Sequence, residues 1–193
     1  MTPKPTVAFS RQRLAKRVNE MGRAISRDYA GRTIDVVVML ENSFLFASDL
    51  VREISRPVVC HFVRSQMRDV RMGGYERREI FFSAAPTIRG RDVLVVDAVI
   101  NTGVTQDFLL KRIEEGRPRS LRLAVLFDKP EARKVDIQPA YTGFAAASKE
   151  WVGYGLSGQR GLGRNLPYVA VKGKTTRSGG QRRKTGARRV SRG

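Results

Sequence analysis

The chain has few of the residues from which disulfides and soft-metal sites are built. Its 193 residues include one cysteine, Cys60, and one histidine, His61. A single cysteine cannot form an intrachain disulfide, and these two residues are too few for a metal site made of Cys and His. The sequence also has no apolar run of signal-peptide or membrane-spanning length. We therefore expect a protein of the reducing cytoplasm that does not contact a membrane.

Acidic residues are scarce as well. The chain has 18 Asp and Glu against 37 Lys and Arg, which gives a formal net charge of +19 and a pI near 11.2. Residues 173–193 carry eight of the basic residues, no acidic residue and hardly an apolar one. Such a segment cannot bury a core. We therefore divide the chain into one domain at 1–172 and a basic, disordered tail at 173–193.

A flexible basic tail can neutralise phosphates and release counterions, which makes RNA or DNA its natural partner. The alternative is that its charge serves solubility alone. Five arginines in the middle of the chain either extend this basic surface or only replace the contacts of a lid: Arg64, Arg68, Arg71, Arg77 and Arg78. They lie in or beside residues 65–78, a segment without clean periodicity that we interpret as a long arm or lid.

Hydrophobic periodicity predicts alternating helices and strands in the domain. Residues 11–29 repeat apolar side chains at helical spacing after Ser10, a favourable N-cap. Apolar runs of strand length occur at 34–40, 57–63, 93–96 and 121–127. This alternation is typical of an α/β fold with a doubly wound, mostly parallel sheet, in which ligands bind at the carboxyl ends of the strands.

The segment at 93–105 carries the clearest chemical signal. Four aliphatic residues are followed by Asp97 and then, through a Thr-Gly turn, by an amphipathic helix. Amides at a helix N-terminus bind phosphate, and a glycine lets the backbone approach an anion closely. We expect Asp97, at the carboxyl end of the strand, to reach ribose hydroxyls or a magnesium-bound diphosphate. The alternative is an ordinary strand, turn and helix with a solvated Asp97. The residues expected to hold a phosphate are Thr102, Gly103, Val104 and Thr105.

This segment resembles the phosphoribosyl-diphosphate motif of type I phosphoribosyltransferases, and other segments resemble the hypoxanthine-guanine branch of that family. The resemblance runs in order from about residue 7 to residue 172. It covers a pyrophosphate loop with its flanking elements at 34–50, a lead-in at 88–92, the strand end Leu126-Phe-Asp-Lys-Pro, and a closing segment at 152–168. It implies the type I phosphoribosyltransferase fold with a small hood, a purine and phosphoribosyl diphosphate as ligands, and a homo-oligomer.

The chain departs from the family in the phosphoribosyl turn. The family carries two adjacent acids and a third acid three positions on, whereas this chain has Asp97, Ala98 and Asn101. The third acid is the family's proposed general base, which takes the N7 proton of the purine. An amide can hold a hydrogen bond there but cannot accept and carry the proton. We therefore expect general base catalysis at Asn101 to be lost.

Other departures fall on the diphosphate and the metal. The pyrophosphate loop has Glu41, Asn42 and Ser43, where the family has Lys-Gly at the first two positions, so a carboxylate stands where a leaving diphosphate needs positive charge. Ser157 is nearest to the position of an acid that helps hold magnesium in the family, and a hard cation prefers carboxylate oxygens. The arm at 65–78 also lacks the Ser-Tyr pair of the family's mobile loop.

The residues that would bind a purine remain. The resemblance assigns Lys129 to the exocyclic oxygen of the purine and Trp151 to a flat contact with its ring. Taken singly, Lys129 is also explained as a surface lysine and Trp151 as a core aromatic.

We therefore expect a nucleotide-responsive pseudoenzyme that binds purine nucleotide, has impaired or absent transferase activity, and contacts nucleic acid through its tail. The rival is an active purine-salvage phosphoribosyltransferase that uses phosphoribosyl diphosphate and hypoxanthine or guanine, with Asp97 alone organising the magnesium. Magnesium enters only in that rival. A third interpretation is a general polyanion-binding protein with an idle pocket.

Overall fold

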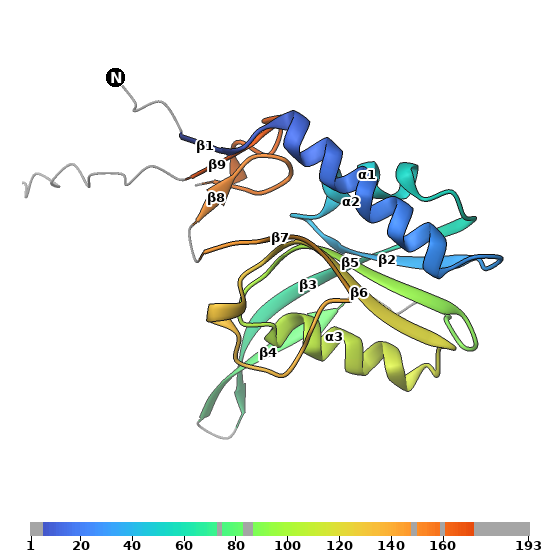
Figure 1. Ribbon diagram of the computed structural model, residues 1–193. Helices are drawn as coiled ribbons and strands as arrows, with labels where there is room; N and C mark the ends of the chain where they lie inside the picture. Colours follow the sequence, from blue (N-terminus) through green and yellow to red (C-terminus); the bar gives the residue numbers. More distant parts are fainter. Residues whose placement is uncertain (1–5, 73–74, 83–86, 148–149, 159–160, 172–193) are drawn as a thin grey trace, which may run out of the picture.

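The computed structural model describes residues 6–72, 75–82, 87–147, 150–158 and 161–171, and within 66–72 and 75–82 it describes the backbone. Figure 1 shows the arrangement of the elements. In chain order they are β1 (Thr6–Phe9), α1 (Arg11–Asp28), β2 (Ile34–Leu40), α2 (Phe44–Glu53), β3 (Val58–Met72), β4 (Tyr75–Phe82), β5 (Asp92–Ile100), α3 (Val104–Glu115), β6 (Ser120–Asp128), η1 (Pro130–Ala132), β7 (Tyr141–Ala145), β8 (Trp151–Val152) and β9 (Val169–Val171).

The main sheet has the strand order β4-β3-β2-β5-β6-β7. Strands β3, β2, β5, β6 and β7 are parallel. The far half of β3 pairs with β4 in an antiparallel hairpin, from Ser65 opposite Phe82 to Met72 opposite Tyr75. The central strands β2 and β5 are buried along almost their whole length. Continuous burial of this kind requires cover on both faces of the sheet.

Helices α1 and α2 cover one face of the sheet and α3 covers the other (Figure 1). Helix α1 begins at the predicted cap, because the Ser10 Oγ accepts a hydrogen bond from the Arg13 amide at 3.3 Å. Its apolar stripe is fully buried, and α3 buries Leu109 and Ile113 in a second core on the opposite face. The sheet therefore separates two hydrophobic layers and holds its strand ends at fixed positions.

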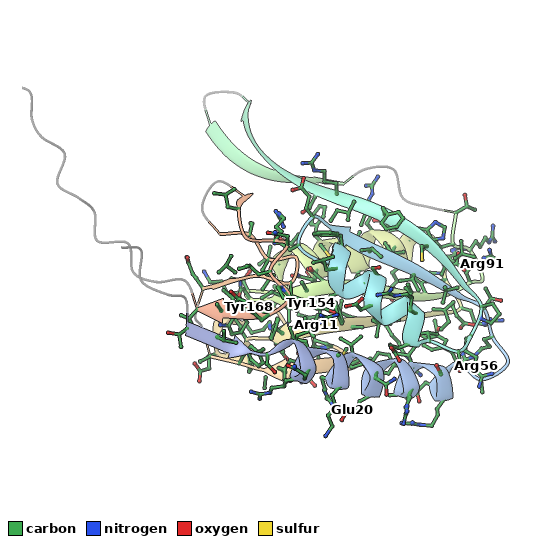
Figure 2. The ribbon with its side chains drawn as sticks, turned by 90° about the horizontal axis from the view of Figure 1, so that it is seen from above. Arg11, Glu20, Arg56, Arg91, Tyr154 and Tyr168 are labelled. Carbon is green, nitrogen blue, oxygen red and sulfur yellow. The ribbon has the colours of Figure 1, made fainter. Side chains whose placement is uncertain are left out.

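A second, three-stranded sheet in the order β1-β9-β8 forms a small hood. It lies at the end of the main sheet where α1 begins and the parallel strands finish (Figure 1). Figure 2 shows Tyr154 and Tyr168 of this region near Arg11, while Arg56 and Arg91 lie at the other end of the molecule. The hood thus rises beside the edge at which parallel sheets bind ligands.

The predicted fold class, a mostly parallel α/β sheet with a small hood, is confirmed. Two predicted strand ends are wrong. The strand expected to finish near Val63 continues to Met72 and forms the hairpin arm with β4, and β5 continues beyond Val96 to Ile100. The role of the arm as a lid stays a prediction, and the tail at 173–193 lies outside the described residues. Among the helices that the structure describes, none is both long and apolar enough to span a membrane.

Candidate active site

Two adjoining cavities lie at the carboxyl ends of β2, β5 and β6. The first has a volume of about 380 Å³, and its walls include Asn42, Asp97, Asn101, Thr102 and Thr105. The second has a volume of about 230 Å³, and its walls include Asn42, Asn101, Lys129, Trp151 and Ser157. Because Asn42, Val99 and Asn101 line both, the two cavities adjoin each other, and we treat them together as one candidate site.

The expected phosphate turn lies between β5 and α3. Gly103 caps α3 with a left-handed backbone, φ 80°. A Cβ atom on this residue would lie 2.8 Å from the Cγ2 atom of Ile137 and 2.9 Å from that of Val135. The Lys134 amide also donates to the Thr102 carbonyl at 2.9 Å. The turn is therefore packed from behind by the segment after β6, and its helix N-terminus offers amides without helical acceptors to an anion.

Asp97 lies within β5 and not at its end, so the prediction of a carboxylate at the strand terminus is wrong. The Asp97 Oδ1 accepts hydrogen bonds from the Ser43 Oγ at 2.8 Å and from the Ala98 amide at 2.6 Å. Its Oδ2 accepts from the Gln106 Nε2 at 2.6 Å. Burial raises the pKa of the Asp97 carboxyl, and the hydrogen bonds from Gln106 and Ser43 partly offset that rise.

Asp97 therefore ties the loop after β2 to the first turn of α3. The prediction that Asp97 contacts ribose hydroxyls or magnesium stays a prediction. The Asp97 Oδ1 accepts two hydrogen bonds and the Oδ2 accepts one, so the Oδ2 keeps one acceptor position for a further ligand.

The purine-side residues come together as expected. Lys129 begins the turn after β6, is 7% exposed, and places its Nζ 4.5 Å from the centroid of the Trp151 ring. Burial lowers the pKa of Lys129, and the charge of Glu150 opposes that effect. Trp151 packs on Phe127 with a centroid distance of 4.7 Å, so it is a core aromatic as well as a wall of the smaller cavity. Its stacking on a purine ring stays a prediction.

The loop after β2 contains a cluster of opposite charges, which we call the Glu41 cluster: Glu41, Arg64 and Arg164. The Glu41 carboxylate forms an ion pair with Arg64 and lies 3.4 Å from the Nη2 of Arg164. Arg164 also donates to the Asn42 Oδ1 at 2.7 Å. The carboxylate of this loop is therefore already neutralised by two cations of the same chain.

Asn101 and Ser157 stand where an acid was expected from the resemblance. Asn101 is exposed at the junction of the two cavities, and Ser157 lines the smaller one. Within the described part of the chain, no group of three or more His, Cys, Asp or Glu side chains is placed to hold a metal ion. Magnesium is usually bound through one or two carboxylates together with the phosphates of a substrate, so the described residues do not form a magnesium site by themselves.

Two functional contacts were not predicted from the sequence. Gln106 holds Asp97, and Arg164 holds Asn42 and Glu41. The contact of Gln106 could have been predicted from its position in the first turn of the helix that follows the phosphate turn, because side chains there lie beside the turn. The pairing of Arg164 with a loop more than a hundred residues earlier had no local signal.

A larger hollow of about 520 Å³ lies between α1, α2 and the closing segment. Within it the Tyr154 hydroxyl donates to Asp49 at 2.5 Å, and the labelled Tyr154 lies beside Arg11 in Figure 2. This hollow collects none of the predicted site residues. We therefore assign the site to the adjoining cavities at the strand ends, where ligands of parallel α/β sheets bind.

Residues 9–157 match the model of the phosphoribosyl transferase domain, and the chain belongs to that family. Its relatives place it in the hypoxanthine-guanine branch of the type I phosphoribosyltransferase family. It is 33% identical over 168 residues to hypoxanthine-guanine phosphoribosyltransferase of Staphylococcus epidermidis, covering 86% of this chain and 92% of that protein. It is 32% identical over 167 residues to the enzyme of the same name from Dictyostelium discoideum, covering 84% and 92%.

Solved structures agree with this assignment. A crystal structure of a hypoxanthine-guanine phosphoribosyltransferase from Bacillus anthracis superposes with a TM-score of 0.75 at 33% identity, covering 87% of this chain and 96% of that one. The chain also matches the bifunctional protein TilS/HprT of Listeria monocytogenes, at 30% identity over 165 residues, but spans about 25% of its length.

Proposed function

We propose that this chain binds a purine nucleoside monophosphate in the two adjoining cavities and that its transferase activity is strongly impaired or absent. The observation that carries the proposal is the position of Asn101, which lines both cavities. A nucleotide with its phosphate at the turn of residues 102–105 and its base beside Lys129 has its glycosidic bond near this junction. The residue at that point decides whether a proton can be taken from the purine.

An amide at this junction supports binding better than catalysis. The Asn101 side chain can donate or accept a hydrogen bond, but it has no basic site that takes up a proton near neutral pH. General acid-base assistance is worth roughly 10² to 10⁴ in rate. The loss of this step alone therefore accounts for a large fall in turnover while the nucleotide contacts persist.

The diphosphate side supports the same conclusion. Glu41 brings a carboxylate to the loop after β2, and its two neighbouring arginines are paired with it. Asp97, the acid that remains in the phosphoribosyl turn, is held by Ser43 and Gln106. Binding of a monophosphate at the amides of α3 needs none of these groups and no metal ion.

A turnover assay tests the catalytic half of the proposal. The purified chain is mixed with phosphoribosyl diphosphate, magnesium and hypoxanthine or guanine, and nucleotide formation is compared with that of the Staphylococcus epidermidis relative. We expect a rate at least about 100-fold lower, in line with loss of the general base. Asn101→Asp is expected to raise any residual rate by at least about 10-fold, whereas Asn165→Asp, the same change outside both cavities, is not. Rates equal to the relative's, abolished by Asp97→Ala, would establish the active-enzyme rival instead.

Calorimetry tests the binding half. GMP and IMP are titrated into the protein without magnesium, and heat of binding at a single site is expected for at least one of them. The absence of heat for both, together with no competition by any purine nucleotide, would favour the third interpretation of an idle pocket. Self-association stays a prediction, which sedimentation of the same samples measures.

A further inference from the structure

Six arginines lie in the loops before the parallel strands, at the end of the sheet opposite to the candidate site. These loops are at 29–33, 54–57, 88–91 and 116–119, and they precede β2, β3, β5 and β6. They contain no Asp or Glu. We call their arginines the arginine rim: Arg32, Arg56, Arg89, Arg91, Arg117 and Arg119. Figure 2 shows Arg56 and Arg91 at this end of the molecule, away from Arg11 and Tyr154.

The strand register places the four loops side by side in one row. The first residues of β3, β2, β5 and β6 are paired with one another in this order. Neighbouring strands lie about 4.8 Å apart, so the row is roughly 14 Å long. Backbone hydrogen bonds also join two of the loops directly. The Gly90 amide donates to the Arg117 carbonyl at 2.9 Å, and the Arg119 amide donates to the Arg91 carbonyl at 2.8 Å. The fold itself therefore sets the spacing of the loops.

Two buried carboxylates lie under the rim and hold three of its guanidinium groups. Asp92 accepts a hydrogen bond from the Arg119 Nε at 3.0 Å and pairs with Arg32 at 3.3 Å. Asp35 lies 3.2 Å from the Arg91 Nε. The side chains of Arg91 and Arg119 are nevertheless 52% and 58% exposed. Because a guanidinium group has five N–H donors, each of these arginines keeps donors for a further acceptor. The carboxylates orient the arginines without covering them.

Arg89 and Arg117 are also exposed, and the described residues form no ion pair with either side chain. Arg117 follows Gly116, the C-cap of α3, and has a left-handed backbone with φ 52°. Glycine is favoured at such a position because it has no Cβ atom. An arginine is therefore less favourable there than a glycine, and the described contacts of its side chain do not offset that cost. The charge at position 117 calls for an explanation outside the fold.

We propose that the arginine rim is a binding surface for the phosphate backbone of a nucleic-acid duplex. Guanidinium groups match phosphate oxygens with paired, planar donors. The phosphates of one strand repeat about every 3.4 Å along the duplex axis, so a row of this length can contact several of them.

The other side chains of the loops support backbone contact alone. The aromatic and large aliphatic residues of these loops, Tyr29, Ile54 and Ile88, are buried. None of them is available to stack on a base or to enter a bilayer. Contacts to phosphates without contacts to bases carry no sequence information, so binding at the rim should be independent of sequence.

This surface is separate from the proposed function. The rim lies at the amino ends of the strands, whereas the two cavities lie at their carboxyl ends. It is also separate from the tail at 173–193, which follows β9 in the chain, because β9 belongs to the hood.

The test is titration of the full chain with RNA and DNA duplexes of the same sequence over a range of salt concentrations, measured by fluorescence anisotropy. Arg89→Gln/Arg117→Gly should bind both duplexes at least about 10-fold more weakly at low salt. For DNA, the slope of log affinity against log salt should become shallower by about 1.8, because each of two lost phosphate contacts contributes about 0.9. The melting temperature should not fall, since glycine suits the left-handed backbone at position 117.

Two matched variants separate the rim from net charge. Lys16→Gln/Lys111→Gln removes two charges from exposed residues of α1 and α3, on opposite faces of the sheet, and should keep the wild-type slope. Arg89→Lys/Arg117→Lys keeps both charges in the rim and should also keep the slope, because release of counterions depends on charge.

Equal losses of duplex affinity in Arg89→Gln/Arg117→Gly and in Lys16→Gln/Lys111→Gln would overturn the inference. Binding of the wild type to vesicles of phosphatidylcholine and phosphatidylserine, but to neither duplex, would overturn it as well. GMP titrated into the same proteins should bind with unchanged affinity, since the rim lies away from both cavities. Failure of GMP to bind the wild type contradicts the nucleotide site alone, whereas a duplex affinity that depends on Arg89 and Arg117 still establishes the rim.

Discussion

The two walls of the site differ in how deeply they are built into the fold. The purine and monophosphate wall contains Gly103, Lys129 and Trp151, which are all buried and packed against the core. The diphosphate wall contains the half-exposed Glu41, on the loop after β2, and the half-exposed Arg64, on β3. A change in the first wall disturbs packing, while a change in the second mainly alters charge in solvent. The exposed wall can therefore lose its chemistry without loss of the scaffold.

Asp97 connects the two walls. Its carboxylate receives hydrogen bonds from Ser43 in the loop of one wall and from Gln106 in the helix of the other. A buried carboxylate that satisfies donors on both sides fixes their relative positions, because opening it leaves polar groups unsatisfied. Asp97 thus has a structural explanation that is independent of any metal or substrate.

The largest expected effect comes from the buried wall. Gly103→Val places a branched side chain where Ile137 and Val135 already lie within 3 Å of the Cβ position, on a backbone with φ 80°. We expect purine nucleotide affinity to fall at least about 100-fold, since strain and overpacking each cost on the order of 1–3 kcal/mol at the residue that shapes the phosphate turn. Calorimetry with GMP measures the change.

The matched control for this prediction is Gly90→Val. Gly90 has a similar φ of 69° but no atom within 4 Å of its Cβ position. It carries the backbone strain without the close packing and lies outside both cavities. Equal loss of affinity in the two variants would show that global destabilisation, and not the phosphate turn, explains the result.

Much of the fold and the buried wall could be predicted from the sequence, because both depend on local patterns. Helix α1 begins at Arg11, directly after its predicted N-cap Ser10, and the phosphate turn follows a strand rich in aliphatic residues. Lys129 and Trp151 lie together as the resemblance implies. The start of α1 and the phosphate turn follow from periodicity and glycine placement, which a chain shows within a few residues, whereas the pairing of Lys129 with Trp151 follows from the resemblance alone.

The contacts of the exposed wall could not be predicted in this way. The four aliphatic residues at 93–96 predicted a short strand, but β5 continues to Ile100. Asn101 therefore lies in the turn just after the strand, and Asp97 lies inside the strand. The Glu41 cluster depends on residues 41, 64 and 164, which tertiary packing alone brings together. The sequence showed that a glutamate stands at position 41, but it did not show that Arg64 and Arg164 pair with that glutamate.

Removal of the tail tests whether polyanion binding is separate from both walls. Deletion of residues 173–193 removes eight positive charges and leaves the described site intact. We expect RNA affinity to fall about 10-fold or more at low salt and the slope of log affinity against log salt to become shallower, because fewer counterions are released. GMP affinity should not change. If the truncated protein has the same RNA affinity and salt slope as the full chain, the tail does not bind nucleic acid.

Lys129 gives a smaller effect on the buried wall. Lys129→Met keeps most of the packing beside Trp151 but removes the donor expected to reach the exocyclic oxygen of the purine. Hydrogen bonds from a charged group contribute about 1.5–3 kcal/mol, so GMP affinity should fall at least about 10-fold. Lys111→Met, which removes an exposed lysine paired with Asp107, serves as the control. A GMP affinity that is unchanged in Lys129→Met would leave Lys129 as a packing residue.

The smallest expected effect concerns the pH dependence of the tie between the walls. Burial raises the pKa of Asp97 in the folded chain. The protonated carboxyl therefore adds to the free energy of unfolding, fully at a pH below the unfolded pKa, and this contribution is lost as pH rises through the folded pKa. The melting temperature of the wild type relative to Asp97→Asn should therefore fall as pH rises above about 4, the ordinary pKa of an Asp side chain, by about 2–4 °C for each 1 kcal/mol of linkage. Asp92, whose pKa Arg119 lowers, destabilises both proteins in acid and cancels in the difference. The control is Asp136→Asn, a change at an exposed residue, which should show no such trend.

A melting-temperature difference between the wild type and Asp97→Asn that stays constant with pH would contradict this prediction. It would mean that folding does not disfavour the charged form of Asp97, and it would support Asp97 as a ligand for ribose or metal.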